Sequence, residues 1–256
     1  MRIAAIYDIH GNLPALEAVI KEIGDAHVDH IVVGGDVVAG PMPVECVDLL
    51  HSKSHEIPIS FVHGNAESEL LRVVSGQAAA GLSPRADEEA EWLATTLRPD
   101  QIEFLKGWLP TVTLNLDSNT AVLFCHATPQ NDTAVFTIQT PAAKVRSLLG
   151  NVAANIVVCG HTHMQFDRQL GGIRIVNAGS VGMPFGQTGA FWLMLDTQKV
   201  DMQHTVYDLQ LAANRINQSG YPQAGEFVMR NVLSAPVKAD AMAMLTQLES
   251  LQQAQQ

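Results

Sequence analysis

The fold is decided near the N-terminus by the stretch Ile3-Ala4-Ala5-Ile6-Tyr7-Asp8-Ile9-His10-Gly11-Asn12. Its apolar first half is typical of a buried strand, and the polar residues that follow indicate a loop. Asn12 is a good N-cap for a helix that has Pro14 in its first turn. Apolar residues then recur at helical spacing, at Leu16, Val19, Ile20 and Ile23. The chain therefore begins with a strand, a loop and an amphipathic helix.

The same order of elements repeats downstream. Ile31–Val33 and Ile57–Val62 are predicted strands, and Val44–Leu50 is a predicted helix between them, preceded by Pro41 and Pro43. A βαβαβ order favours parallel strands that are joined by right-handed crossovers. We therefore expect an α/β protein.

The second half of the chain also contains adjacent strands and a surface helix. Turn residues at Asp117-Ser118-Asn119 and at Gly171-Gly172 indicate two hairpins. We predict a helix at Pro141–Leu149 and strands at Thr111–Leu116, Ala121–Cys125, Ile156–Cys159, Gln165–Leu170, Arg174–Asn177, Ala190–Leu195 and Val200–Val206. Two such halves indicate two packed mixed sheets with helices outside.

Two segments are expected to be helical additions. Residues 66–108 are predicted to be wholly helical, with Ser83 capping Pro84–Leu97 and Pro99 opening a helix that ends at Trp108. From Leu209 the chain is again predicted to be helical, with breaks near Gly220-Tyr221-Pro222 and Ala235-Pro236 and a frayed Gln-rich end. We predict one catalytic domain at 1–208, with 66–108 as an insert, and a helical extension packed on it at 209–256.

Composition excludes several classes of protein. The net charge of −11 argues against a nucleic-acid duplex as a partner, because no basic surplus is present to neutralise phosphates. No apolar run approaches the roughly 20 residues of a membrane span, and the N-terminus is too short for a signal sequence. Cys46, Cys125 and Cys159 match no disulfide framework or zinc motif and are expected to be buried thiols. A soluble, cytoplasmic protein is predicted.

Five predicted strands or their loops are followed by residues that bind metals. These segments are Asp8-Ile9-His10, Gly34-Gly35-Asp36, Gly64-Asn65, Cys125-His126 and Gly160-His161-Thr162-His163. In open α/β sheets ligands bind beyond the carboxyl ends of the strands, so we expect the five segments to converge at one edge. Each residue alone has an ordinary explanation, such as a helix cap at an Asp, a satisfied polar group at His126 or a left-handed turn at Asn65. Together they favour a site for two divalent cations.

The ligand types restrict the chemistry of this site. Carboxylate, imidazole and amide groups without thiolate suit manganese, iron, zinc, cobalt or nickel. Two metals in such a site lie ~3.5–4 Å apart and share a ligand, and Asp36 is the best candidate because two glycines precede it. Asp8 and His10 stand at alternate positions, so both can face the site from an extended loop. His161 and His163 repeat that spacing.

As an ordered set, these motifs resemble the calcineurin-like metallophosphoesterase superfamily. The segment Asn177-Ala178-Gly179-Ser180-Val181-Gly182 resembles that of its small bacterial and archaeal phosphodiesterase-like branch. The resemblance implies a four-layer α/β/β/α sandwich and in-line attack on phosphorus by a hydroxide that bridges two metals. It implies that one metal takes Asp8, His10, Asp36 and His163, and that the other takes Asp36, Asn65, His126 and His161.

One departure from the family bears on the substrate. The family has a histidine after the metal-bound asparagine that helps to protonate the leaving group, and this chain has Ala66 there. General acid catalysis contributes ~10²–10⁴-fold, mostly for poor leaving groups. We therefore predict a preference for phosphoanhydrides, such as nucleotide polyphosphates, and for activated phosphodiesters. His63 can substitute for the missing imidazole, or it can be an ordinary strand-end residue.

Other features leave alternatives open. In the loop Thr128–Phe136, Asn131 and Asp132 either contact substrate or satisfy their own turns. Met183–Gly189 is a second candidate substrate loop, and Trp92 and Trp108 are expected in the core. The insert and the C-terminal helices can form a lid or an oligomer contact. The partner predicted is a small phosphorylated substrate, with a nucleotide as one candidate. The alternative functions are a phosphomonoesterase, a phosphoprotein phosphatase, or a metal- and nucleotide-binding protein without catalysis.

Overall fold

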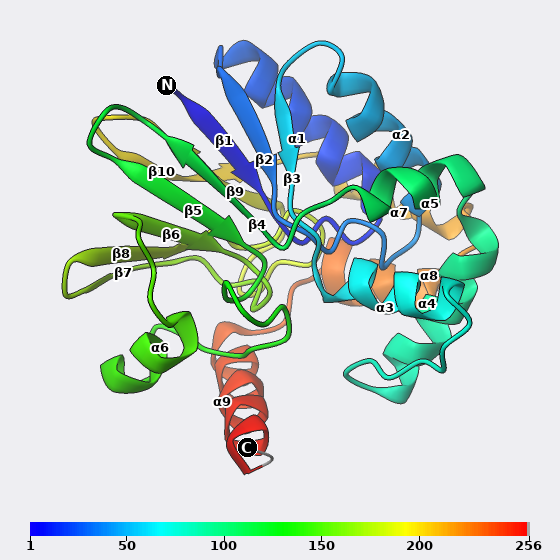
Figure 1. The fold of residues 1–256 in the computed structure, drawn as a ribbon. Helices are drawn as coiled ribbons and strands as arrows, with labels where there is room; N and C mark the ends of the chain where they lie inside the picture. The colour runs from blue at the N-terminus through cyan, green and yellow to red at the C-terminus, as the bar shows by residue number, and fades with distance from the viewer. Residues whose placement is uncertain (255–256) are drawn as a thin grey trace.

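The computed structural model describes residues 1–254 (Figure 1). Within them the strands form two five-stranded sheets. The first sheet has the order β10 (Val200–Thr205), β9 (Ala190–Leu195), β1 (Ile3–Ile6), β2 (His30–Val33), β3 (Ile59–Phe61). Strands β1, β2 and β3 are parallel, and β9 runs antiparallel to β1 and β10. The predicted parallel βαβαβ unit is confirmed.

The second sheet is built from the other half of the chain. Its order is β4 (Thr111–Asn115), β5 (Ala121–Cys125), β6 (Ile156–Cys159), β8 (Ile173–Asn177), β7 (Phe166–Leu170). The parallel strands are β5, β6 and β8, whereas β4/β5 and β7/β8 are the two predicted hairpins. Both sheets are therefore mixed.

An apolar layer joins the two sheets face to face. Ile3, Ala5 and Val32 from the first sheet are buried with Phe124 and Val158 from the second. Helices α1 (Leu13–Asp25) and α2 (Pro43–Lys53) cover the outer face of the first sheet, and α6 (Ala142–Leu149) covers that of the second (Figure 1). The predicted four-layer α/β/β/α sandwich is confirmed.

The insert contains three helices: α3 (Asn65–Val74), α4 (Pro84–Thr96) and α5 (Pro99–Lys106). Ser83 caps α4 as predicted. The prediction of a wholly helical insert is wrong for residues 75–83. Gly76, at φ +81°, follows the end of α3, and the N–H groups of Ala80 and Gly81 bond to side-chain carboxylates instead of helix carbonyls. Trp108 is buried in the core.

The C-terminal part contains α7 (Leu209–Asn217), α8 (Ala224–Phe227), a π-helical turn at Val228–Val232 and α9 (Lys238–Ala254). The predicted breaks are confirmed. Fraying is not seen up to residue 254, because Gln252 accepts the N–H of Val135 and donates to the Thr133 carbonyl. Gln255 and Gln256 lie outside the described residues. The division of the chain at residue 208 stays a prediction.

None of the helices within residues 1–254 is long and apolar enough to cross a membrane. Cys46, Cys125 and Cys159 are free and buried, as predicted.

Candidate metal centre

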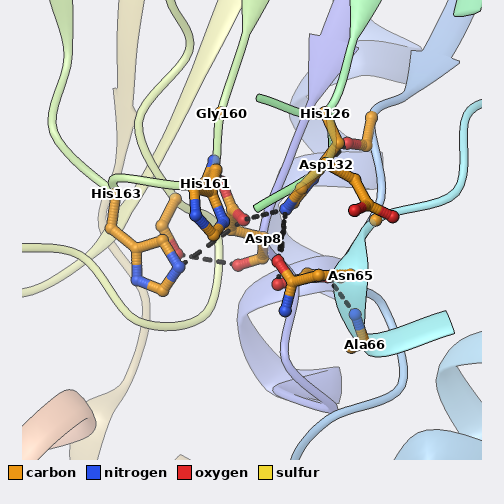
Figure 2. A network of polar contacts seen from close by, with 12 residues as sticks. Asp8, Asn65, Ala66, His126, Asp132, Gly160, His161 and His163 are labelled. Atoms are coloured by element: carbon orange, nitrogen blue, oxygen red, sulfur yellow. Dashed lines mark hydrogen bonds and ion pairs between the residues drawn. The ribbon is translucent and has the colours of Figure 1, made fainter. Parts of the chain in front are cut away.

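The predicted ligand residues converge between the two sheets. The ligand residues form two groups, and within each group the ligand atoms all lie within 4.8 Å of one another. One group is Asp8, His10 and His163, and the other is Asp36, His126 and His161. In the first group Asp8 and His10 follow β1 and His163 follows β6; in the second, Asp36 follows β2, His126 follows β5 and His161 follows β6. Each group therefore draws on both sheets. Figure 2 shows His161, His163, Asp8 and His126 pointing toward one another.

The backbone turns sharply at most of these residues. Five of them have left-handed φ angles between 48° and 65°: Asp8, His10, Asp36, His161 and His163. The prediction of an extended loop at Asp8 and His10 is therefore wrong, although both side chains do face the site. For an L-residue this conformation costs roughly 1–2 kcal/mol. The strands and their loops must hold it, as do the bonds from the N–H of Asp8 to Gly35 O and from that of His10 to Asp36 O.

Three imidazoles are oriented by the backbone. In each, Nδ1 lies 2.9 Å from a carbonyl oxygen: that of Ala39 for His10, Gly34 for His126 and Met183 for His163. Because Nδ1 must donate there, the neutral rings turn their Nε2 lone pairs into the site. The Nε2 atoms of His10 and His163 are 3.1 Å apart, so two lone pairs face each other unless a proton or a cation lies between them.

The carboxylates of Asp36 and Asp8 each accept a backbone N–H group at one oxygen and turn the other oxygen toward the imidazoles. Asp36 Oδ1 accepts the N–H of Ala66, and its Oδ2 lies 3.9 Å from His10 Nε2 and 3.5 Å from His126 Nε2. Asp36 thus stands between the two groups, where a bridging ligand is needed. Asp8 Oδ2 accepts the N–H of His161, whereas the buried Asp8 Oδ1 has no hydrogen-bond donor among the described residues. An orphaned buried carboxylate oxygen that faces imidazole nitrogens fits a cation.

Electrostatics at the site reflect carboxylates and imidazoles packed together. Burial alone would lower the pKa of His126, but the carboxylates of Asp36 and Asp8 raise it to about 10. Burial and the neighbouring His126 lower the pKa of His161 to about 4. Against the effect of burial, His126 holds the pKa of Asp36 far below its usual range, and His163 lowers that of Asp8. Both aspartates are therefore available as anionic ligands.

Asn65 joins the second group. Its Oδ1 lies 3.1 Å from His126 Nε2 (Figure 2). Asn65 is the first residue of α3, and Gly64 before it is extended with φ −99°, so the alternative of a left-handed turn is wrong. The close approach that glycine permits is visible at Gly35, where an added Cβ would lie 2.4 Å from Gly64 N and 2.8 Å from His126 Nδ1.

Glu67 supports the site and was given no role from the sequence. It is fully buried, and its carboxylate accepts N–H groups from four residues of the two ligand loops: Asp36, Val37, Val38 and Gly64. Burial and the nearby Asp36 carboxylate raise its pKa to about 7. The available signal was a glutamate at the third position of a helix, which is where it can bond back to the residue before the helix.

Two cavities open at the centre. One, of about 240 Å³, reaches His10, Asp36 and Asn65, and Ala66 forms part of its wall. The other, of about 360 Å³, is lined by His63 and His126 among others. Ala66 and His63 thus line different cavities.

Asp132 and Thr133 line both cavities, and Asp132 lies on the side of Asn65 and His126 in Figure 2. Ser68 Oγ donates to Asp132 Oδ2 at 2.6 Å and lies 3.0 Å from His63 Nδ1. Asn131 accepts the N–H of Thr133 in a turn. Of the two loop candidates, Asp132 lines both cavities, whereas Asn131 lines the second cavity only and its Oδ1 is engaged in its own turn.

The chain is similar to known proteins in sequence and in fold. The family model of the calcineurin-like phosphoesterase superfamily domain matches residues 1–200. An uncharacterized protein of Methanocaldococcus jannaschii is 24% identical over 242 residues, covering 86% of this chain and 94% of that protein.

Two solved structures share the fold. A hypothetical protein of Pyrococcus horikoshii OT3 superposes with a TM-score of 0.77 at 16% identity, covering 91% of this chain and 99% of the other. A metallophosphoesterase of Sphaerobacter thermophilus superposes with a TM-score of 0.69 at 24% identity, covering 90% and 97%.

Proposed function

Because this chain belongs to the calcineurin-like phosphoesterase superfamily, we propose that it hydrolyses phosphodiester or phosphoanhydride bonds with two divalent metal ions. One observation carries the proposal: two groups of oxygen and nitrogen ligands meet between the sheets, and both border open cavities. A purely structural metal site is usually closed by protein ligands.

The protein's own residues hold and orient the reacting groups. Asp8, His10 and His163 would bind one cation, and Asn65, His126 and His161 the other, with Asp36 shared. When bound, two such cations activate a water molecule and stabilise the charge that develops on the phosphoryl oxygens. The carbonyls at the three Nδ1 atoms keep the imidazoles in the tautomer that can bind a metal.

The side chain at position 66 supports a preference for good leaving groups. Ala66 offers no proton at the cavity that it lines. His63 would supply one only from the other cavity, past Ser68 and Asp132. Because Ser68 donates to Asp132, the Nδ1 of His63 must donate to Ser68, and a neutral His63 has no proton left on Nε2.

We propose that the substrate is a small phosphorylated molecule and that the protein works in a reducing compartment such as the cytoplasm. The buried free thiols of Cys46, Cys125 and Cys159 support the second proposal.

The test is turnover of bis(p-nitrophenyl) phosphate by metal-stripped protein, with and without added manganese. This diester has a good leaving group, so the absence of an imidazole at position 66 does not conceal activity. Metal-dependent release of nitrophenolate is expected, with p-nitrophenyl phosphate hydrolysed more slowly. Faster hydrolysis of the monoester would favour a phosphomonoesterase or phosphoprotein phosphatase. No turnover with two metals bound per chain would favour a protein that binds metal without catalysis.

A further inference from the structure

The cavity beneath the insert is built for one part of a substrate. Its inner end is formed by His10, Asp36 and Asn65, so a substituent of a phosphoryl group at the metal centre extends directly into it. Helices α3 and α4 and the segment between them make the remaining walls together with Asp132 and Thr133. The cavity is therefore placed to contact one ester group of the substrate.

Most of the wall is apolar and made of small side chains. Ala66, Ala86 and Ala90 line it together with the larger Leu82 and Leu93. Leu93 is buried, whereas Leu82 is 57% exposed and lies where the cavity meets solvent. An alkyl or aryl body fits such a surface, because contact removes apolar area from water on both sides.

The charged groups in the wall beyond the metal centre all have one sign. They are the carboxylates of Glu69, Glu89 and Asp132, and among the described residues no lysine or arginine lines this cavity. Of two nearby arginines, Arg72 donates to the Ala78 carbonyl, and Arg85 pairs with Glu226 at 2.9 Å and also interacts electrostatically with Glu89. Arg85 thus offsets part of one of the three charges from outside the lining, and an anionic group in the cavity would still meet an excess of carboxylates.

The carboxylates are held in place by neighbouring groups. Glu89 accepts the hydroxyl of Tyr221 at 2.6 Å, Asp132 accepts that of Ser68 at 2.6 Å, and Glu69 accepts the N–H of Ala80. Each contact engages one oxygen of its carboxylate. The cavity thus combines fixed negative charge with an apolar wall, and these two properties match an organic cation.

We propose that this cavity binds a compact, ammonium-bearing ester substituent of the substrate. The proposal rests on the proposed function and narrows it: a phosphodiester with a cationic substituent is favoured, and a nucleotide polyphosphate is disfavoured. In the reaction, the oxygen of water forms a new bond to phosphorus and the P–O bond to the leaving group breaks. One proton of the water passes through solvent to a leaving alkoxide, or stays in solvent when the leaving group departs as a phenolate. The charge of the substituent changes binding and leaves this chemistry unchanged.

Three 4-nitrophenyl phosphodiesters test the proposal with one common leaving group. Their second substituents are 2-aminoethyl, propyl and carboxymethyl, which are similar in size and are cationic, neutral and anionic. At pH 8.5 with manganese, we expect kcat/KM to fall in that order, with about tenfold between the first two, because a carboxylate–ammonium pair in a partly desolvated site is stronger than one in water. An equal or reversed order would overturn the proposal.

Variants assign the preference to the wall. Glu69→Gln and Glu89→Gln keep the shape and an acceptor oxygen, and each should lower the aminoethyl-to-propyl ratio severalfold, with the double variant near unity. Glu88→Gln is the matched control. This substitution also removes one negative charge from α4, but at an exposed position that does not line the cavity. A ratio that is unchanged in the double variant, or that falls equally in the control, would overturn the assignment.

A binding experiment separates this proposal from the proposed function. Amide signals of Ala66, Ala80 and Gly81 in the metal-free protein should shift on addition of propylammonium and not on addition of propionate. If bis(p-nitrophenyl) phosphate is not hydrolysed with metals bound, the proposed function fails while these shifts still test the cavity. If the diester is hydrolysed and propionate binds as well as propylammonium, the cavity proposal fails and the function stands.

Discussion

Replacing Glu67 with glutamine should destabilise the two loops of the metal centre while leaving every predicted metal ligand unchanged in sequence. Glu67 Oε1 accepts the N–H groups of Val37 and Val38, and Oε2 accepts those of Asp36 and Gly64. In Glu67→Gln one oxygen keeps two of these bonds, and the new NH₂ group faces the other two donors. Two bonds to a charged acceptor are then lost, at about 1.5–3 kcal/mol each.

Part of that loss is offset. Because burial and Asp36 disfavour the ionised carboxyl of Glu67, whose pKa is raised to about 7, removing its charge relieves unfavourable interactions. We expect a net loss of about 2–3 kcal/mol in the unfolding free energy of the metal-free protein. With metals bound, the loss of unfolding free energy should be larger. The cations then balance the negative charge of Asp36, so replacing Glu67 with glutamine relieves less repulsion between the two carboxylates.

Urea unfolding at pH 8 followed by far-UV circular dichroism measures this change, with and without manganese. Glu103→Gln is the control: Glu103 lies on α5 with a side chain that is 70% exposed, and a surface change of this kind alters stability by about 0.5 kcal/mol or less. Manganese affinity should fall in Glu67→Gln and stay unchanged in the control. A Glu67→Gln protein as stable as the parent in both conditions would refute the idea that this carboxylate holds the two loops together.

Three further changes address the site directly. Asp36→Asn should lose at least one metal and nearly all hydrolysis while its circular dichroism stays native, because the amide oxygen can still accept the N–H of Ala66; near-normal turnover would exclude Asp36 as the bridging ligand. His63→Ala should slow substrates with poor and good leaving groups alike, because a neutral His63 donates its one ring proton to Ser68; a loss of about 10–100-fold confined to poor leaving groups would instead show that His63 is the proton donor. Metal binding at pH 7 should release about one proton from His126, whose pKa of about 10 keeps it protonated in the metal-free protein, so affinity should rise with pH. Calorimetry in two buffers of different ionisation enthalpy measures this proton, and identical heats would contradict the prediction.

Much of the fold follows from local patterns. The run before Asp8, the cap at Asn12 and the turn at Asp117-Ser118-Asn119 each predicted an element that the structure contains. The convergence of the ligand segments was also predictable, because parallel strands place their carboxyl ends at one edge. These features depend on a few neighbouring residues or on a general rule of topology.

The features that could not be predicted depend on contacts between distant residues. The left-handed turns at Asp8 and His10 are held by carbonyls of Gly35 and Asp36, and these turns replaced the predicted extended loop. The segment 75–83 was predicted to be helical, yet the carboxylates of Glu69 and Asp87 accept the N–H groups of Ala80 and Gly81.

The C-terminal helix shows the same limitation at longer range. Glu249 on α9 accepts the hydroxyl of Thr140, although the two residues lie 109 positions apart along the chain. Glu249 also pairs with Lys144. Gln252 bonds to Thr133 and Val135. No local pattern in the glutamine-rich end indicates that it anchors the loop that lines both cavities.

Because each ligand group takes residues from both sheets, the order of synthesis constrains when metal can be acquired. A ribosome-bound chain that ends before His126 carries Asp8, His10 and Asp36 but neither complete group. His161 and His163 emerge later, and they reach the aspartates only after the second sheet has packed on the first. A newly made chain would therefore bind metal tightly only after its two halves have assembled. The onset of tight metal binding would then mark the completion of that assembly in the cell.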